Sequence, residues 1–592
     1  MGRIRKYRLE EALMEMCTVC PLDCYDACRI IIDENGALRG DKTHSVTQGY
    51  LCPNLNHFDD TKRITQPRFL GEEISMEKAL EILEERLSRI EPTQTLFYRG
   101  SGNMGLMQRS MDHFFGSMGA VGTRGSLCDG AGEAGVLLGR GVNYPLSPEM
   151  VAKADVVIVW GRNLHATHSH LLPFLKGKKI IVIDPVQTAL VKNADLYIQI
   201  KPHCDLHLAL LLSRFCIIEG FQDKEFLEQY GSGYEEFYEL TQTVRIKATL
   251  DSIDVTLGQI GSLLEMVQGK KTVILVGVGV QKYQNGSDVL RAIDAFGALL
   301  GLFGKEGCGV SFLGSSLESL ELPFRSIAKT IPKPTVNFSN YSTVFIQGGN
   351  PLGQMPNSVK VGEELSKCPF KVYFGLYENE TSRACDLILP AQTFLEKEDV
   401  RASYGDFTLQ KMGKLREATC GISEYALARR LCDKFNLLIP SEEECLELLH
   451  RQMEMVDGVE MKRNRPKIPY NDGFKTDSGE FEFIDEIDLG LSSEEGYFLI
   501  TSKSSKSLNS QFKRMEGIYL HPECGFLSDE DVRVSSKVGE CRMRVHHDER
   551  LRRDCALIYS GTPDVNVLTP SLMSYEGENA VYQEYKIKVE KI

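Results

Sequence analysis

Several cysteines near the start of the chain have a spacing that could bind a metal centre. Cys17, Cys20 and Cys24 follow the pattern C-x2-C-x3-C, and Cys52 lies further along. A zinc site usually pairs its ligands in two C-x2-C-like knuckles, whereas a cubane takes three thiolates from one loop and a fourth from a distant segment. The spacing therefore favours a [4Fe-4S] cubane, with a structural zinc or unrelated core thiols as alternatives. Cys28 stands where a strand is expected to begin, and we predict that it only packs there.

Another cysteine, Cys128, lies in the glycine-dense stretch "VGTRGSLCDGAGEAG". Glycines let a backbone approach a large flat ligand closely, and a lone thiolate is a soft metal ligand. A structural role is the commoner one for a cysteine in such a turn, so this signal is weak by itself.

Three histidines, His165, His168 and His170, form the motif "HATHSH" just after an expected strand. They could deliver protons to a substrate, because the charge of histidine changes near neutral pH. The alternatives are a solvated loop with fortuitous histidines and, less favoured, a zinc ion held by all three.

These residues must be positioned by an α/β framework. Short apolar runs rich in β-branched and aromatic residues alternate with helical patterns, which predicts parallel sheets with crossover helices. Such sheets place ligands beyond the carboxyl ends of their strands. An amphipathic helix is expected over 74–90, and a mainly β domain beyond about residue 470. The expected strands are 95–100, 155–161, 178–184, 271–277, 343–349 and 370–376.

Composition limits the class of protein. The 592 residues are too many for one core and suggest several domains. A formal net charge of −14 disfavours nucleic acid or an anionic membrane surface as the main partner. There is no run of about 18 apolar residues and no secretory signal, so we expect a cytoplasmic protein without direct membrane insertion. The 17 cysteines fit that compartment if most are reduced or bound to metal.

Taken together, these features resemble the molybdenum or tungsten oxidoreductases that carry two molybdopterin guanine dinucleotides. That family includes dimethyl sulfoxide reductase, nitrate reductase, thiosulfate and polysulfide reductases and formate dehydrogenases. The resemblance extends over nearly the whole chain in the family's order. Besides the cysteine cluster it includes "GRNLHATHSHLL", "GGNPLGQMPN", "ETSRACDLILPAQTFLEKEDV" and a tail with "LNSQF", "HPECG" and "NVLTP".

The resemblance implies a four-domain α/β fold with two doubly wound Rossmann-like domains and a C-terminal double-psi β-barrel. On that basis we expect a [4Fe-4S] domain over 1–62 and a discontinuous α/β domain over 63–145 plus 325–465. A dinucleotide-binding domain is expected over 146–324 and the barrel, which also binds the molybdopterin dinucleotide, over 466–592.

The resemblance also implies roles for single residues. The [4Fe-4S] ligands would be Cys17, Cys20, Cys24 and Cys52, and Cys128 would bind Mo or W. Asp129, His165 and His168 are the further catalytic candidates. Dinucleotide contacts are implied for Gly161, Asn163, Asp184, Pro185, Thr188, Asp205, Gly349, Asn350, Pro351 and Asn566.

Departures from the family pattern narrow the chemistry. Asn54 stands where the family usually has a lysine between cluster and pterin, which predicts a lower cluster potential or weaker coupling. Asp129 stands where formate dehydrogenases carry a histidine, and an ionised side chain there would repel formate or nitrate. Acetylene hydratase has an Asp where this chain has Pro21. His203 and Cys204 replace a Gly-Thr pair, a change that the sequence does not explain.

The sequence therefore predicts a two-electron redox or oxo/sulfur-atom transfer enzyme that acts on a small molecule, with a sulfur compound as the first choice of substrate. Electrons would pass through one cluster to a separate protein, a ferredoxin-like subunit or a diaphorase, because no flavin or nicotinamide fingerprint is present. The alternatives are a formate dehydrogenase-like activity, a complex-I-type electron carrier without the metal, and a zinc-binding structural protein.

Overall fold

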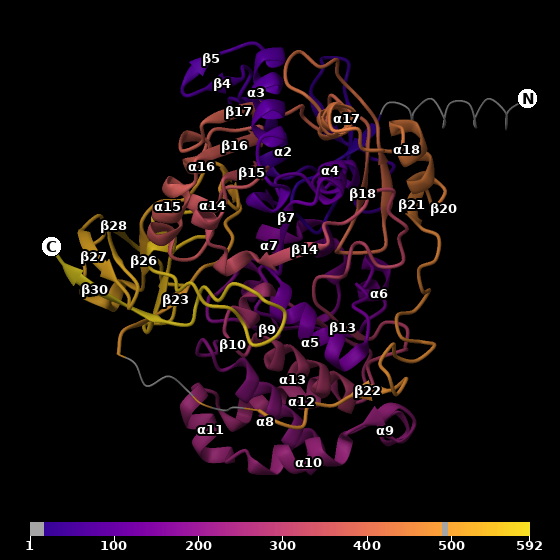
Figure 1. Cartoon of the computed structure of the whole chain (residues 1–592). Coiled ribbons are helices and arrows are strands. Elements are labelled where there is room, and N and C mark those ends of the chain that lie inside the picture. The colour runs from indigo at the N-terminus through magenta and orange to yellow at the C-terminus, as the bar shows by residue number, and fades with distance from the viewer. Residues whose placement is uncertain (1–16, 488–489, 491–494) are drawn as a thin grey trace, which may run out of the picture.

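The computed structural model describes residues 17–487, 490 and 495–592 (Figure 1). The first 16 residues of the expected 1–62 domain thus lie outside the described residues. The chain begins with a small antiparallel sheet in the order β1-β2-β3, formed by β1 (Cys17–Val19), β2 (Arg29–Ile32) and β3 (Leu38–Gly40). A cysteine-rich loop joins β1 to β2, and the short helix α2 (Pro53–Asn56) starts directly after Cys52.

One of the two large sheets has eight strands, of which six consecutive ones are parallel and the last two, at one edge, are antiparallel. Its order is β14 (Lys329–Pro332), β7 (Val121–Arg124), β6 (Thr95–Arg99), β15 (Thr343–Gln347), β16 (Phe370–Gly375), β17 (Leu387–Pro390), β4 (Arg68–Phe69) and β5 (Glu72–Glu73).

Helices cover both faces of this sheet. One face packs on α3 (Met76–Ser88), α4 (Ser110–Met118), α17 (Glu424–Lys434) and α18 (Glu442–His450), and the other on α15 (Ser358–Lys367). The expected helix over 74–90 is confirmed as α3. It starts at Ser75, whose side chain accepts a hydrogen bond from the backbone of Lys78.

The other large sheet has five parallel strands. Its order is β10 (Leu196–Ile198), β9 (Lys179–Ile183), β8 (Val156–Trp160), β12 (Thr272–Val276) and β13 (Gly309–Ser311). All five residues of β8 are buried because alternate side chains enter two different cores, one on each face. The runs expected as strands from 95 to 376 are therefore confirmed.

Helices α5 (Gly130–Arg140), α8 (Asp205–Ile218) and α13 (Gly286–Leu299) pack on one face of this sheet. Beyond them lie α9 (Lys224–Tyr230), α10 (Tyr234–Thr243), α11 (Ile246–Ile253) and α12 (Leu257–Val267), which form the lower end of the molecule in Figure 1.

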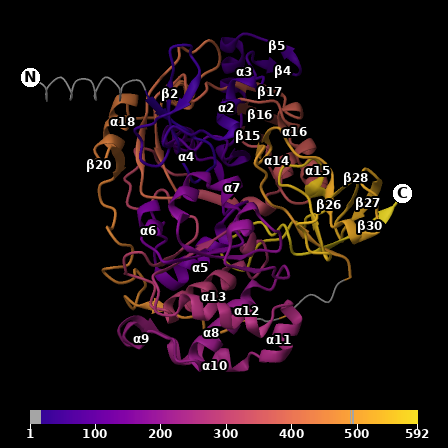
Figure 2. The same ribbon diagram turned by 180° about the vertical axis from the view of Figure 1, so that it is seen from behind.

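The C-terminal part closes into a six-stranded barrel, so the expected fold class is confirmed. The barrel order is β23 (Tyr497–Ile500), β29 (Cys555–Leu557), β26 (Ile518–Leu520), β28 (Glu540–His547), β27 (Asp531–Ser535) and β30 (Lys586–Lys591). Figures 1 and 2 both show it beside α14 (Pro351–Gln354) and α15 at one flank of the molecule. A loop over 501–512, with the hairpin β24 (Ser507–Leu508) and β25 (Gln511–Phe512), leaves the barrel after β23.

The domain boundaries remain a prediction. Within the described residues, no helix is long and apolar enough to cross a membrane.

Candidate active site

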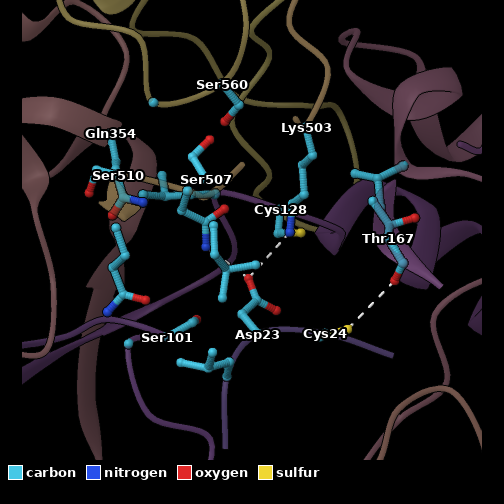
Figure 3. A pocket seen from close by; sticks show the side chains of 18 of the residues that line it. Asp23, Cys24, Ser101, Cys128, Thr167, Gln354, Lys503, Ser507, Ser510 and Ser560 are labelled. Atoms are coloured by element: carbon cyan, nitrogen blue, oxygen red, sulfur yellow. Dashed lines mark hydrogen bonds and ion pairs between the residues drawn. The ribbon is translucent and has the colours of Figure 1, made fainter. Parts of the chain in front are cut away.

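A cavity of about 890 Å³ lies where the strand ends of both large sheets meet the cysteine-rich loop and the 501–512 loop. The residues that directly follow four parallel strands line it: Gly100, Gly161, Gly277 and Gly348. The cavity therefore occupies the position at which parallel sheets bind ligands. Figure 3 shows that side chains from these separate segments point into it.

Cys128 lies in this cavity, in the loop between β7 and α5. Ser126 shapes the turn, because its hydroxyl oxygen accepts hydrogen bonds from the backbone nitrogens of Cys128 and Asp129 at 2.9 and 3.1 Å. The same hydroxyl donates to the Asp129 carboxylate at 2.7 Å. The thiol is thus presented by a turn that is already hydrogen-bonded.

Two residues that the sequence analysis missed hold the Cys128 backbone. Gln281 Nε2 and Lys282 Nζ both donate to the carbonyl oxygen of Cys128 at 2.7 Å. Gln281 Oε1 also accepts from the backbone nitrogen of Gly132 at 2.9 Å. One side-chain amide thus binds both Cys128 in the loop and Gly132 in the first turn of α5. The sequence feature that could have indicated these two residues is their position. They come five and six residues after the end of β12, in the segment that follows a parallel strand.

The Cys128 thiol is protonated near neutral pH. Burial raises its pKa to about 11; Asp129 adds to the rise, while Lys503 and Lys282 oppose it. A soft metal ion would displace this proton, because thiol ligands bind as thiolates. At the Cys128 thiol, the positive charges of Lys503 and Lys282 therefore oppose the effect of the negative charge of Asp129.

The expected contacts of one dinucleotide gather along the strand ends of the five-stranded sheet. Gly161, Asn163, Asp184, Pro185, Thr188 and Asp205 all line the cavity. Buried polar atoms there lack a partner among the described residues, namely Asn163 Oδ1 and Thr188 Oγ1. Such atoms are costly to leave unpaired, which indicates a polar ligand.

Two of these residues are carboxylates buried without a cation. Asp184 Oδ1 accepts from the backbone nitrogen of Val186 at 2.8 Å, and Asp205 Oδ1 accepts from Trp160 Nε1 at 2.7 Å. Burial raises the pKa of Asp184 to about 7 and that of Asp205 to about 6. A ligand edge with several N–H donors would stabilise both as carboxylates.

The second set of expected contacts lies at the end of β15. Gly349, Asn350 and Asn566 line the cavity, and Pro351 begins α14 beside them. Asn350 Nδ2 donates to Glu380 and Ser510, and Asn566 Nδ2 donates to the carbonyl oxygen of Gly353 at 3.0 Å. These contacts join the barrel and its loop to the eight-stranded sheet.

The structure places the "HATHSH" histidines mostly against the cysteine-rich loop, not around Cys128. His168 and His170 are buried, with ring nitrogens 3.5 and 3.0 Å from the Asp26 carboxylate. The ring of His168 stacks on Tyr25 at 4.9 Å. His165 is exposed and lines the cavity. The position of His168 therefore does not support a role in delivering protons to a substrate.

Four cysteines come together, but they are not the expected four. The cavity is lined by Cys20, Cys24, Cys28 and Cys52. The pKa of Cys28 is raised mainly by burial and by Asp26, and further by the charges of Cys20, Cys24 and Cys52, so the four thiols are close enough to influence one another. A hydrogen bond from the backbone of Cys20 to that of Cys28, 2.9 Å, closes the base of the loop.

Cys17 lies elsewhere. It belongs to β1, opposite Ile31, and the groups that influence its pKa besides burial are Arg29, Glu460 and Asp41. Pairing within the sheet thus keeps Cys17 in the strand, whereas Cys28 lines the cavity. The sequence signal that was available is the second run C-x3-C-x3-C over 20–28. Among the described residues, no three His, Cys, Asp or Glu side chains are arranged to hold a single metal ion.

Comparison with known proteins assigns the family. The model of the molybdopterin oxidoreductase family matches residues 71–419, more than half of the chain. The chain belongs to this family of enzymes. The probable oxidoreductase YyaE of Bacillus subtilis (strain 168) is 29% identical over 79% of this chain and 78% of its own length. The probable oxidoreductase YoaE of the same strain is 25% identical over 97% of this chain and 98% of its own.

More distant matches agree. Formate dehydrogenase H of Escherichia coli (strain K12) is 27% identical over 50% of this chain and 46% of its own length. Acetylene hydratase from Pelobacter acetylenicus superposes with a TM-score of 0.80 over 98% of this chain and 100% of that one. With 17% identity, this match shows the fold alone.

The residues of the cavity fit the molybdopterin cofactor that the family implies. The strand ends of β8 and β12 that line the cavity pack closely on each other, because a Cβ atom at Gly277 would lie 1.8 Å from the carbonyl oxygen of Gly161. Only glycine fits there. Together with the unpaired polar atoms near β8 and β9 and the thiol of Cys128, this arrangement suits a large polar cofactor that carries a soft metal.

Proposed function

We propose that this molybdopterin oxidoreductase binds two molybdopterin guanine dinucleotides and converts a small substrate at Mo or W bound by Cys128. The observation that carries the proposal is the placement of Cys128. Its backbone is held by Ser126, Gln281 and Lys282, in a cavity that also reaches four gathered cysteines. When bound, the metal cofactor supplies two-electron redox or oxo/sulfur-atom transfer chemistry.

The chain's own residues would hold and orient the cofactor. Asp184 and Asp205 offer carboxylate oxygens to the N–H edge of one guanine, and Gly161, Asn163, Pro185 and Thr188 complete that half. Gly349, Asn350, Pro351 and Asn566 would contact the other half. This assignment is supported by the raised pKa values of the two carboxyl groups, because N–H donors would relieve the cost of their burial.

For the [4Fe-4S] cluster we propose Cys20, Cys24, Cys28 and Cys52 as the ligands, in place of the set with Cys17. A cubane takes three thiolates from one loop and one from a distant segment, and these four satisfy that rule. Electrons would leave through the cluster to a separate cytoplasmic protein, a ferredoxin-like subunit or a diaphorase.

A small sulfur compound remains our first choice of substrate. A formate dehydrogenase-like activity is the second candidate, and one observation favours it. Lys282 and Lys503 both act on Cys128, so the negative charge of Asp129 does not by itself exclude a small anion. Because the family is one of enzymes, a role as a metal-free electron carrier is disfavoured.

The experiment is elemental and nucleotide analysis of protein purified without oxygen from a host able to make the cofactor. We expect Mo or W, guanine nucleotide released by acid, and about four irons per chain. Iron without Mo, W or guanine nucleotide from a competent host would refute the proposal. Protein that contains Mo or W, guanine nucleotide and iron would then be screened for activity with sulfur oxyanions, polysulfide and formate.

A matched pair of variants tests the ligand set. Cys28→Ala should lose most of the iron and the visible absorption of the cluster. Cys17→Ala, which changes a buried thiol of the neighbouring strand, should keep both. The opposite pattern would restore the ligand set that includes Cys17.

A further inference from the structure

Lys503, on the loop that leaves the barrel, reaches the cysteine-rich loop at the other end of the chain. Its Nζ lies 3.5 Å from Asp23 Oδ2, and Asp23 stands between two of the proposed cluster ligands, Cys20 and Cys24. Figure 3 shows Lys503 extending toward Cys128 and Asp23 within the cavity.

Asp23 is held by three side chains from two parts of the chain, so the position of this ion pair is well defined. Asp23 Oδ2 also accepts from Asn509 Nδ2 at 3.0 Å, and Asp23 Oδ1 accepts from the Tyr404 hydroxyl at 3.0 Å. Lys503 and Asn509 come from the 501–512 loop, whereas Tyr404 follows β18 (Asp399–Ala402). The barrel loop is therefore fastened onto the cysteine-rich loop.

The ammonium group of Lys503 acts on both proposed metal centres. Burial by itself lowers the pKa of Lys503, but the Asp23 carboxylate 3.5 Å away raises it and keeps the ammonium group charged. The charge is thus permanent near neutral pH. Cys24 is a proposed cluster ligand and Cys128 the proposed ligand of Mo or W, so one fixed positive charge lies near each.

We propose that Lys503 raises the reduction potential of the cluster and so favours electron transfer to it from the substrate-converting metal. This inference rests on the proposed function. A fixed cation stabilises the cluster after it has gained an electron, and nearby charge is one of the factors that set the potential of such clusters.

Lys503 also bears on the cluster potential predicted from Asn54. The sequence predicts a lower cluster potential because position 54 lacks a positive charge. Asn54 does line the cavity, but a lysine 449 positions later in the chain brings a positive charge to the same region. Lys503 is a positioning residue of the electron path, since the proposed effect is exerted through its charge.

The test is an EPR-monitored redox titration of the cluster in the holoenzyme. A unit charge about 10 Å away through an effective dielectric of about 20 changes an equilibrium constant roughly tenfold. Lys503→Met should therefore lower the cluster potential by about 59 mV, the equivalent of tenfold for one electron. Asp23→Asn should raise the potential, and the double variant should return it toward that of the wild type.

Two variants serve as controls. Lys503→Arg keeps the charge, and Lys506→Met removes an exposed charge three residues further along the same loop. Both should titrate close to the wild type.

If Lys503→Met does not move the potential, or if both single charge removals move it in the same direction, the inference is wrong. If Lys503→Met fails to fold, Lys503→Gln, which removes the charge but keeps a polar side chain, takes its place in the titration. Wild-type protein without a cluster signal would refute the proposed function as well, which distinguishes the two failures.

Discussion

Replacement of Asp184 by Asn should stabilise the cofactor-free protein at pH 8 and change its stability little near pH 4. The folded-state pKa of Asp184 is about 7, raised by burial from an ordinary value near 3.8. Between these values the folded state holds a proton that the unfolded state has released. The wild type therefore loses stability as the pH rises from about 4 to about 7, and no more above that.

The expected gain follows from this pKa. At about 1.4 kcal/mol per pKa unit, ionisation of Asp184 in the folded state costs about 4 kcal/mol at pH 8. An Asn side chain carries no charge, and its carbonyl oxygen can still accept the 2.8 Å hydrogen bond from Val186. For a domain of about 150–250 residues, each kcal/mol is worth about 2–4 °C in melting temperature. We therefore expect Asp184→Asn to melt about 8–16 °C higher at pH 8.

The assay is thermal melting followed by circular dichroism from pH 4 to 8, on protein from a host that cannot make molybdopterin. Asp195→Asn is the matched control, because hydrogen bonds from Lys179 and from the backbone of Ile180 hold the pKa of Asp195 below its usual range. That variant should gain nothing at pH 8. Equal melting temperatures of wild type and Asp184→Asn at pH 8 would refute the reasoning. In the cofactor-loaded protein, Asp184→Asn should retain less guanine nucleotide, because a carboxylate acceptor is lost.

Three further substitutions test other parts of the site and the fold. Cys128→Ala should abolish turnover while the iron content stays at the wild-type level; surviving activity would show that Cys128 is not the metal ligand. Gln281→Ala removes both of its hydrogen bonds to the metal-ligand loop, which should cost about 1–3 kcal/mol and lower the Mo or W content per chain. Unchanged metal content would contradict that role. Arg140→Met leaves the fully buried Asp294 without its partner and should destabilise the protein by about 3–5 kcal/mol in urea unfolding. A loss below about 1 kcal/mol would mean that water or another group compensates.

The amino-acid sequence alone was sufficient to predict the fold class. Runs such as 156–160 and 273–276 are apolar throughout and are followed by glycine, a pattern that suits strands buried on both faces of a parallel sheet. These are local properties, so they can be recognised without knowing what packs against them. The same holds for strand-end residues such as Gly161 and Asp184, because the ends of parallel strands meet at one edge.

What only the tertiary structure decided is which side chains meet across long separations in the chain. The cysteine spacing led to Cys17 as a cluster ligand and Cys28 as a packing residue, whereas the pairing of β1 with β2 places the former in the sheet and the latter at the cavity. Lys503 meets Asp23 across 480 positions. No periodicity or motif encodes such contacts, because they arise when separately folded parts of the chain pack together and bury their polar groups against one another.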